Sequence, residues 1–335
     1  MTVKVFQVDP RALMMPYSYE REAIQAAGGE FILGDCHTED DVIAQAGAAD
    51  AEILLVAGKP LVTGRVLSAL PKVRYAIRTG VGYDVIDIDA ATERGVAVGN
   101  APTYCGEEVA EHAIALLMAV ARRIVWAHER IRAGGWVYPG GPIHRLTGKT
   151  LGIIGCGNIG SKVAARAQGL GMTVIAYDKF RPDDELRAIG VEPVSFDEAL
   201  ARADYVSIHV LLNAGTRKLI DAAALAKMKP DAMLVNTSRG PVVDQEALAD
   251  ALESGHLGGA ALDVFEVEPL AADSRLRTME HVILTPHHAS YSIESIQGLR
   301  EEVCANVAEW IATGWASNVR NPEVRDHLRP RLAAV

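Results

Sequence analysis

The sequence predicts an α/β fold built on mostly parallel β-sheets. Between residues 150 and 285, short apolar segments of strand length alternate with segments of helical periodicity. The composition agrees, because 49% of the 335 residues are hydrophobic but only 5% are aromatic, so small apolar side chains dominate a large core. Such side chains suit the close packing of helices against sheets.

The first hundred residues predict an α/β unit of their own. Its strands are expected at residues 2–8, 53–56, 73–77 and 96–99. A long amphipathic helix is expected at 107–122, where apolar residues recur at helical spacing. The segment 126–148 is rich in Gly and Pro, so we expect it to be irregular and too long for an ordinary connection. A chain of 335 residues has room for two such units.

Beyond residue 150 the predicted elements follow one another regularly. A strand at 151–154 leads through a glycine turn into a helix that ends at Gly171. Ser195 and Glu198 form a capping box, which predicts the start of another helix. Further strands are expected at 172–177, 204–210, 232–236, 259–264 and 281–285. The last helix, 292–312, is followed by no strand, and we expect it to return to the first unit.

Charge and cysteine content limit the partners and the location of the protein. The formal net charge is −10 and Lys and Arg form no run, so neither nucleic acid nor an anionic membrane is expected as a partner. No apolar segment reaches membrane-spanning length, and the first residues do not resemble a signal peptide. The cysteines form no paired motif, which predicts reduced, buried thiols. They are Cys36, Cys105, Cys156 and Cys304. Together these features predict a cytoplasmic protein.

A glycine-rich motif follows the strand at 151–154. Gly155, Gly157 and Gly160 fit the pattern GxGxxG. The first glycine permits a tight bend, the second lets the backbone approach a pyrophosphate, and the third allows helix and strand to pack closely. The N-terminus of the following helix then faces the negative charge. The position of the motif between a strand and a helix indicates a dinucleotide-binding site.

Asp178 ends the next predicted strand, about 20 residues after the motif, at the spacing expected for the ribose-binding acid. A carboxylate at this position accepts hydrogen bonds from both ribose hydroxyls of NAD and repels the 2′-phosphate of NADP. Lys179 and Arg181 lie close by in the sequence. The other interpretation of Asp178 is an acid in a solvated loop. We expect NAD as the cofactor.

Three polar segments follow predicted strands of the second unit, where ligands bind in parallel sheets. They are residues 236–240, 263–269 and 285–289. Arg239 can anchor a carboxylate through two parallel hydrogen bonds. Either His287 or His288 can transfer a proton. Either Glu266 or Glu268 can orient that histidine. Each of these residues also has a purely structural interpretation, as an ion-pair partner, a turn residue or a solvated acid.

The chain resembles the D-isomer-specific 2-hydroxyacid dehydrogenase family from end to end. The matching segments lie at 78–84, 108–112, 152–160, 235–240, 263–269 and 284–287. The last three are highly specific and read Val-Asn-Thr-Ser-Arg-Gly, Asp-Val-Phe-Glu-Val-Glu-Pro and Leu-Thr-Pro-His. Within the family the chain is most similar to the C-terminal-binding-protein-like branch and to the glycerate and phosphoglycerate dehydrogenase branches.

The resemblance implies roles for the residues that were left open above. It implies His287 as the acid–base residue, Glu268 as its partner and Arg239 as the carboxylate anchor. The backbone N–H groups of the loop with Val81 and Gly82 would hold the substrate carboxylate, and no metal is implied. Cofactor contacts are implied for Gly155, Gly157, Asn158, Ile159, Gly160, Asp178, His209, Thr237 and Asp263. Separately, we expect Arg78 to favour a substrate with a second negative group.

The family fold is two Rossmann-like, doubly wound parallel-sheet domains, with the NAD domain inserted into the substrate domain. The resemblance implies an NAD-binding domain at 101–289 and a flavodoxin-like substrate domain at 1–100 plus 290–335. It also implies a homodimer, because the segment 126–148 resembles the family's dimerisation arm. The implied reaction is the NAD-dependent interconversion of a small 2-oxo acid and its D-2-hydroxy acid.

The chain departs from the family pattern at two positions near the site. His209 is followed by Val-Leu-Leu-Asn, where the family has x-Pro-Leu-Thr, and Ser290 stands where the related corepressors carry Trp. Two other functions fit the same motifs. One is an NAD-responsive, corepressor-like interaction protein, and the other is a dehydrogenase of the same fold that oxidises formate or phosphite.

Overall fold

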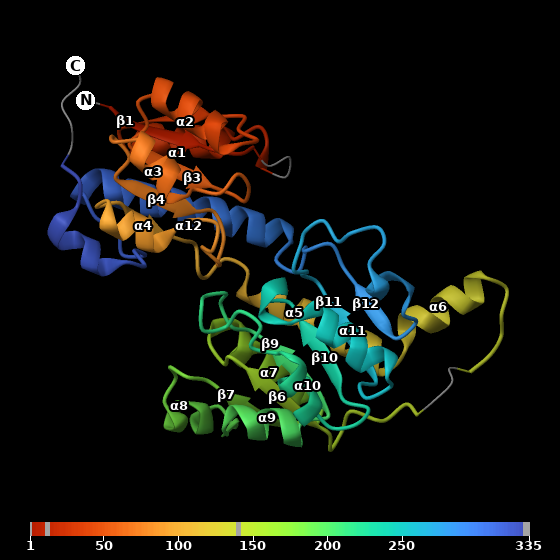
Figure 1. Cartoon of the computed structure of the whole chain (residues 1–335). Helices are drawn as coiled ribbons and strands as arrows, with labels where there is room; N and C mark the ends of the chain where they lie inside the picture. The colour runs from red at the N-terminus through yellow and green to blue at the C-terminus, as the bar shows by residue number, and fades with distance from the viewer. Residues whose placement is uncertain (1, 11–13, 139–141, 331–335) are drawn as a thin grey trace. The chain divides into compact units, whose positions relative to one another are not determined.

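The computed structural model describes residues 2–10, 14–138 and 142–330 (Figure 1). The chain divides into two compact units, which we call unit 1 (Met1–Cys105 with Ser292–Val335) and unit 2 (Gly106–Tyr291). The domain boundaries expected from the sequence, at 100/101 and 289/290, remain a proposal. Parts of those domains, namely residues 1, 11–13, 139–141 and 331–335, lie outside the described residues.

Within the described residues, unit 1 contains a parallel sheet of five strands in the order β2-β1-β3-β4-β5. This order is that of flavodoxin-like, doubly wound sheets. The strands are β1 (Val3–Gln7), β2 (Gly29–Leu33), β3 (Ile53–Val56), β4 (Tyr75–Arg78) and β5 (Ala97–Gly99). The helices are α1 (Ser18–Ala26), α2 (Glu39–Ala48), α3 (Gly64–Ala69), α4 (Ile88–Glu93) and α12 (Ile293–Thr313), with a 3₁₀ helix η4 (Pro322–His327).

Helices cover both faces of the unit 1 sheet, because the pleat sends alternate strand residues to opposite sides. Ile53 and Leu55 of β3 join the core on the side of α1 and α12. Leu54 and Val56 join the core on the side of α2 and α3. On the first side, the Trp310 ring of α12 stacks on Tyr75 of β4 with ring centroids 4.3 Å apart. The C-terminal helix is thereby part of the core that the N-terminal strands build.

Unit 2 contains a second parallel sheet, which has seven strands among the described residues in the order β12-β11-β10-β9-β6-β7-β8. The strands are β6 (Thr150–Ile154), β7 (Thr173–Tyr177), β8 (Glu192–Pro193), β9 (Tyr205–Ile208), β10 (Met233–Asn236), β11 (Gly259–Leu262) and β12 (Val282–Leu284). The helices are α5 (Gly106–Ala121), α6 (Ile124–Arg132), α7 (Asn158–Gly169), α8 (Asp183–Ala188), α9 (Phe196–Arg202), α10 (Ala222–Lys227) and α11 (Gln245–Glu253), with 3₁₀ helices η2 (Gly240–Val242) and η3 (Arg275–Thr278).

The strand order of unit 2 reverses at β6, which pairs with β7 on one side and with β9 on the other. In doubly wound sheets, ligands bind beyond the carboxyl ends of the strands at such a reversal. One face packs against α5 and α7 through residues such as Leu117 and Val163. The other face packs against α9, α10 and α11, with Leu200 and Leu248 among the buried residues. The predicted fold class, two doubly wound parallel-sheet α/β domains, is confirmed.

Two predictions about local structure were incomplete. The strand β2 (Gly29–Leu33) was not predicted, and the segment 126–148, expected to be irregular, is helical in α6 up to Arg132. The helix forms because residues 124–132 contain neither Gly nor Pro, which first appear at Gly134 and Pro139. Residues 139–141 of this segment lie outside the described residues.

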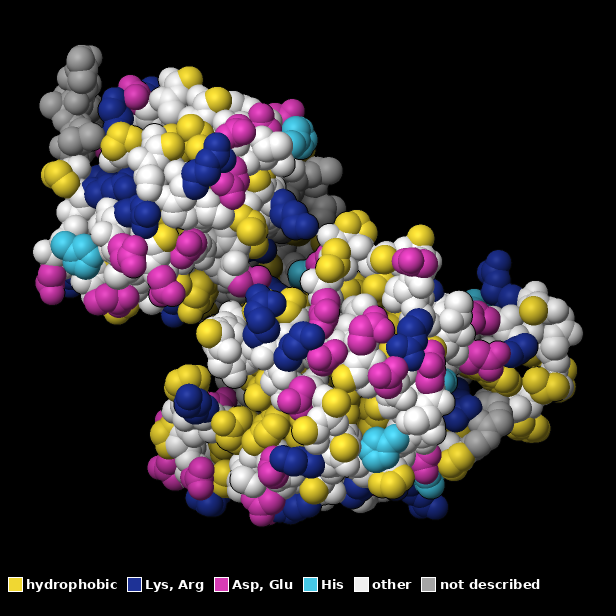
Figure 2. Space-filling view, viewed as in Figure 1, with side chains coloured by type: hydrophobic (Ala, Val, Ile, Leu, Met, Phe, Trp, Pro, Cys, Tyr) yellow, Lys and Arg dark blue, Asp and Glu magenta, His cyan; other side chains and the backbone are white. Residues whose placement is uncertain are grey.

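Surface charge, cysteine burial and helix composition can be compared with the expectations from the sequence. On the face drawn in Figure 2, Lys and Arg are scattered among Asp and Glu rather than gathered into one basic area. The four cysteines are buried free thiols, as the sequence predicts. None of the helices in the described ranges combines the length and the apolar character that a membrane span requires.

Candidate active site

The glycine turn after β6 is shaped by two close backbone approaches. Gly155 has φ +90°, and a Cβ there would lie 3.0 Å from the backbone of His209, which follows β9. A Cβ on Gly160 would lie 2.3 Å from the carbonyl oxygen of Gly155, so α7 can start this close to β6 only with glycine. A Cβ on Gly157 would meet nothing within 4 Å. The packing of the described residues therefore requires Gly155 and Gly160, whereas Gly157 leaves open space at the start of α7.

Asp178 ties the loop after β7 to this glycine turn. Its Oδ2 accepts a hydrogen bond from the backbone N–H of Cys156 at 2.7 Å. Its Oδ1 accepts from the N–H groups of Phe180 and Arg181 at 2.9 and 3.0 Å. The Arg181 guanidinium donates to the carbonyl of Cys156 and to Ser161 Oγ, both at 2.8 Å. The carboxylate is thus held in place against the glycine turn. Asn158 and Ile159 are the first two residues of α7, which follows that turn.

His209 stands on the other side of the same turn. Its Nε2 forms a hydrogen bond of 2.8 Å with Ser207 Oγ. Burial lowers the pKa of His209 to about 4, so the ring is neutral at pH 7. A neutral ring adds no charge beside the glycine turn.

The loop after β10 carries Thr237 and Arg239. Asn236 braces the loop, because its Oδ1 accepts from Ser238 N–H at 3.0 Å and its Nδ2 donates to the carbonyl of Arg239 at 3.0 Å. A Cβ on Gly240 would lie 1.8 Å from the carbonyl carbon of Phe265, so the loops after β10 and β11 touch backbone to backbone. Thr237 Oγ1 is buried, and no described residue forms a hydrogen bond with it. Such an atom requires a partner from a ligand or from water.

Glu268 and His287 form a hydrogen-bonded pair. Glu268 Oε1 accepts from the backbone N–H of Phe265 at 3.0 Å, and Oε2 lies 2.7 Å from His287 Nδ1. Burial raises the pKa of Glu268, but the hydrogen bonds from His287 and Phe265 and the nearby charge of Arg239 outweigh it and lower the pKa overall. The other glutamate, Glu266, accepts instead from Gln245 N–H at 3.1 Å, at the start of α11.

The backbone of His287 is held in an unusual conformation. Its φ is +51°, in the left-handed region that side-chain-bearing residues rarely adopt. The N–H of His287 donates to the carbonyls of Asp263 at 2.8 Å and Thr285 at 3.1 Å. These bonds, with the one to Glu268, determine the direction of the imidazole ring.

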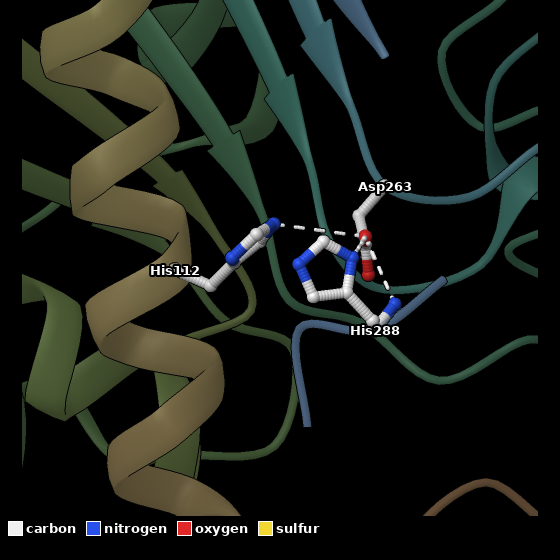
Figure 3. A group of neighbouring side chains, drawn as sticks. All are labelled: His112, Asp263 and His288. Atoms are coloured by element: carbon white, nitrogen blue, oxygen red, sulfur yellow. Dashed lines mark hydrogen bonds and ion pairs between the residues drawn. The ribbon is translucent and has the colours of Figure 1, made fainter. Parts of the chain in front are cut away.

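Asp263 lies wholly buried between the loops after β11 and β12. Its Oδ1 accepts from Thr285 Oγ1 at 2.6 Å and from His288 N–H at 3.1 Å, and its Oδ2 accepts from Ala289 N–H at 2.9 Å. His112 approaches Asp263 from α5 (Figure 3). Its Nε2 also lies 3.1 Å from Thr285 Oγ1. Burial lowers the pKa of His112, the charge of Asp263 opposes this, and His288 adds to it.

The structure brings most of the predicted residues together at the carboxyl edge of the unit 2 sheet. Arg78, Val81 and Gly82 lie instead in unit 1, after β4. There the Arg78 Nη1 donates to the carbonyl of Thr79 at 2.6 Å, and Asn100 Nδ2 donates to the carbonyl of Val81 at 2.6 Å.

Two residues of the site, His112 and Thr285, received no role from the sequence. A signal for His112 was present, because it shares one helical face with Val109 and Leu116, which are both buried. A histidine within an apolar stripe needs a polar partner in the core.

Residues 114–289 match the family model described as the NAD-binding domain of D-isomer-specific 2-hydroxyacid dehydrogenases. A D-3-phosphoglycerate dehydrogenase of Mycobacterium leprae is 42% identical over 293 residues, which are 87% of this chain and 55% of that protein. The chain therefore spans little more than half of that relative's length.

Two further proteins are similar over most of their own length. A glyoxylate reductase of Korarchaeum cryptofilum is 43% identical over 267 residues, which cover 78% of this chain and 80% of that protein. The solved structure of a glyoxylate reductase from Paecilomyes thermophila superimposes with a TM-score of 0.88 at 31% identity, covering 96% of this chain and 99% of that one.

Replacing Glu268 by Gln is expected to remove a pH-dependent contribution to stability. The pKa of Glu268 in the folded chain lies below its ordinary value of 4.5, so the ionised carboxylate stabilises the fold above that pH. The contribution is lost as the pH falls through the lower, folded-state pKa. Thermal unfolding midpoints of wild type and Glu268→Gln, measured from about pH 3 to about pH 7, are therefore expected to converge at the acidic end.

The control is Glu266→Gln, because Glu266 contacts Gln245 and not a histidine. A gap between wild type and Glu268→Gln that stays constant over the whole pH range would contradict the expected ionic contribution.

Proposed function

Because this chain belongs to the D-isomer-specific 2-hydroxyacid dehydrogenase family, we propose that it interconverts a small 2-oxo acid and its D-2-hydroxy acid with NAD. The observation that carries the proposal is the 2.7 Å hydrogen bond between Glu268 Oε2 and His287 Nδ1. A carboxylate that orients an imidazole at the carboxyl edge of a parallel sheet is the arrangement expected of an acid–base catalyst.

His287 is the proposed acid–base residue. The ionised carboxylate of Glu268 can only accept a hydrogen bond, so the proton between the two groups belongs to His287 Nδ1. His287 Nε2 is therefore the nitrogen that exchanges a proton with the substrate. In reduction, the protonated ring donates to the alkoxide that develops at the former 2-oxo group. In oxidation, the neutral ring takes the hydroxyl proton. Glu268 stabilises the positive ring and keeps its direction.

Arg239 is the proposed carboxylate anchor. Its Nη1 donates to the carbonyl of Ser238 at 2.8 Å. Its positive charge is one of the causes that lower the pKa of Glu268, which supports a position near the His287–Glu268 pair. A guanidinium can bind a carboxylate through two parallel hydrogen bonds and stabilise negative charge on the neighbouring oxygen.

The residues of unit 2 fit a dinucleotide. The open space at Gly157 and the unpartnered Thr237 Oγ1 both support a ligand at this edge. We propose that Gly155, Gly157, Asn158, Ile159 and Gly160 hold the pyrophosphate, Asp178 the ribose, His209 the adenine side, and Thr237 and Asp263 the nicotinamide side. The Asp178 carboxylate favours NAD over NADP, because it would face the 2′-phosphate of NADP. When bound, the nicotinamide supplies hydride for reduction and accepts it in oxidation.

In unit 1 we propose that the backbone of Val81 and Gly82 binds a substrate carboxylate and that Arg78 favours a second negative group. The relatives named above act on different acids according to their names, D-3-phosphoglycerate and glyoxylate, so they leave the substrate to experiment.

A homodimer is proposed on the strength of the exposed α6 region. No residue of α6 is buried, and apolar side chains concentrate from Ile124 to Tyr138. Ile131 is 53% exposed and Trp136 is 90% exposed. Apolar side chains gathered on a surface indicate a protein contact. We also propose a cytoplasmic location, which suits the four buried free thiols.

His287→Ala is expected to lower kcat by about 10²- to 10⁴-fold, because general acid–base catalysis contributes that much. NADH absorbance is followed with glyoxylate, hydroxypyruvate, pyruvate, phenylpyruvate and oxaloacetate. His37→Ala, at an exposed histidine of unit 1, serves as the control. Tight NADH binding without turnover of any acid would favour the NAD-responsive interaction protein. Oxidation of formate or phosphite would favour the dehydrogenase of the same fold that uses those donors.

Gly157→Ala and Gly160→Ala are expected to fail in different ways. Gly157→Ala should keep the wild-type unfolding midpoint, because its Cβ meets nothing, yet weaken NADH binding. Gly160→Ala should lose about 1–3 kcal/mol of stability, because its Cβ strikes a backbone carbonyl. Fluorescence titration with NADH and thermal unfolding separate the two effects. Unchanged NADH affinity in Gly157→Ala would count against a pyrophosphate at this turn.

Replacing Ile131 and Trp136 together by Glu is expected to convert the dimer to a monomer, because two carboxylates would enter an apolar contact. Light scattering after size-exclusion chromatography reports the mass. Phe180→Glu, at a side chain that is 86% exposed elsewhere in unit 2, should leave the mass unchanged. A dimer that persists in the double variant would exclude this surface.

A further inference from the structure

Two histidines and an aspartate from three separate elements of unit 2 meet beside His287 (Figure 3). His112 comes from α5, Asp263 follows β11 and His288 follows β12. Asp263 Oδ1 lies 3.6 Å from His112 Nε2 and 3.7 Å from His288 Nδ1. All three ligand atoms lie within 4.8 Å of one another. The two rings meet edge to face with centroids 4.7 Å apart.

These separations are close to those between ligands of one small metal ion. Bonds of about 2.1 Å in a tetrahedral site place neighbouring ligand atoms on the order of 3.4 Å apart. The two measured distances to Asp263 exceed this by only a few tenths of an ångström. The two histidine nitrogens lie within 4.8 Å of each other, so the two rings must also turn toward one another to close the site around an ion.

The charge at the cluster also favours a cation. The Asp263 carboxylate is 0% exposed, and its hydrogen-bond donors are a hydroxyl and backbone N–H groups. Among the described residues, the ion-pair partners of this carboxylate are the two histidines, and neither Lys nor Arg reaches it. Burying a carboxylate without a full positive charge is costly, so an added cation would be stabilised here.

The donor set selects the kind of ion. Two imidazoles and one carboxylate suit Zn²⁺ and similar transition metals, whereas Mg²⁺ and Ca²⁺ prefer oxygen ligands. The His288 side chain is 47% exposed, so an ion can enter from its side and keep positions for water.

Thr285 contacts the ligand nitrogen of His112 when no ion is bound. Its single hydroxyl hydrogen goes to Asp263 Oδ1 at 2.6 Å, so the 3.1 Å contact with His112 Nε2 is donated by the ring. Ion binding at Nε2 requires the proton to move to Nδ1, which is the other neutral tautomer of the same ring.

We propose that His112, Asp263 and His288 form a binding site for a divalent transition-metal ion of the Zn²⁺ type. The ion shares Asp263 with the nicotinamide side of the proposed cofactor site. The ion and the dinucleotide therefore exclude each other, and the ion inhibits the dehydrogenase reaction. This inhibition rests on the proposed function, whereas ion binding itself does not.

The test uses the full chain after metal has been removed with a chelator. It is titrated with Co²⁺, whose visible absorption reports binding at a low coordination number. A second titration uses Zn²⁺ in competition with a chromophoric chelator. Wild type is expected to bind one equivalent. His288→Ala and His112→Gln are expected to weaken ion binding at least about ten-fold. Even the loss of a residue that only hydrogen-bonds to a metal ligand lowers metal affinity by about that factor. His287→Ala, the adjacent histidine outside the cluster, is the matched control and should bind as wild type does.

Absence of binding to wild type, or wild-type affinity in His288→Ala, would overturn the site. Equal loss in His287→Ala would also overturn it, because the ion would then lie on the His287–Glu268 pair. Thermal unfolding measured without the ion shows whether each variant is folded. If His112→Gln is unstable, the test rests on His288→Ala, because the His288 side chain is half-exposed. Zn²⁺ binding that leaves NADH affinity unchanged would refute the inhibition and Asp263 as a cofactor contact, while the metal site would stand.

Discussion

The candidate site depends on the hydrogen bonds that the buried carboxylate of Asp263 accepts. This carboxylate receives hydrogen bonds from Thr285, His288 and Ala289, so it holds the whole loop after β12. Between these anchors the chain places His287 in the left-handed region, which costs about 1–2 kcal/mol for a residue with a side chain. The loop keeps this conformation because removing Asp263 would leave several buried donors without an acceptor. Asp263 thus fixes the backbone from which the His287 ring projects, both through its carboxylate and through its carbonyl, which accepts from His287 N–H at 2.8 Å.

Close backbone contact is the second constraint on the site. Gly160 lets α7 start against the glycine turn, and Gly240 lets the loops after β10 and β11 touch. These contacts bring Arg239 and Glu268 to one place although they come from different strands. Gly157 differs from both, because nothing in the described packing requires it. The distinction shows which part of the glycine motif serves the fold and which part is available to a ligand.

Much of the fold could be predicted because its signals are local. The all-apolar segment of β3 and the capping box of Ser195 and Glu198 appear in the structure where the pattern indicates them. The strand β2 was missed because it begins with Gly, carries Glu30 and pairs only with β1 at the sheet edge. The polar segments left His287 or His288 and Glu266 or Glu268 open, and the family resemblance selected His287 and Glu268, which the structure places in contact. The approach of His112 to Asp263 could not be predicted, because it depends on how α5 packs against the sheet.

The discontinuous composition of unit 1 has a consequence for how the chain folds as it is synthesised. Its sheet comes from the first hundred residues, but Trp310 of α12 supplies part of its core against Tyr75. Unit 2 is a single continuous stretch, so all its strands are synthesised before α12 is made. Domains generally fold in the order in which they are completed. The nascent sheet of unit 1 must therefore wait with part of one apolar face uncovered, beside α1, and during that interval it is exposed to chaperones and to aggregation.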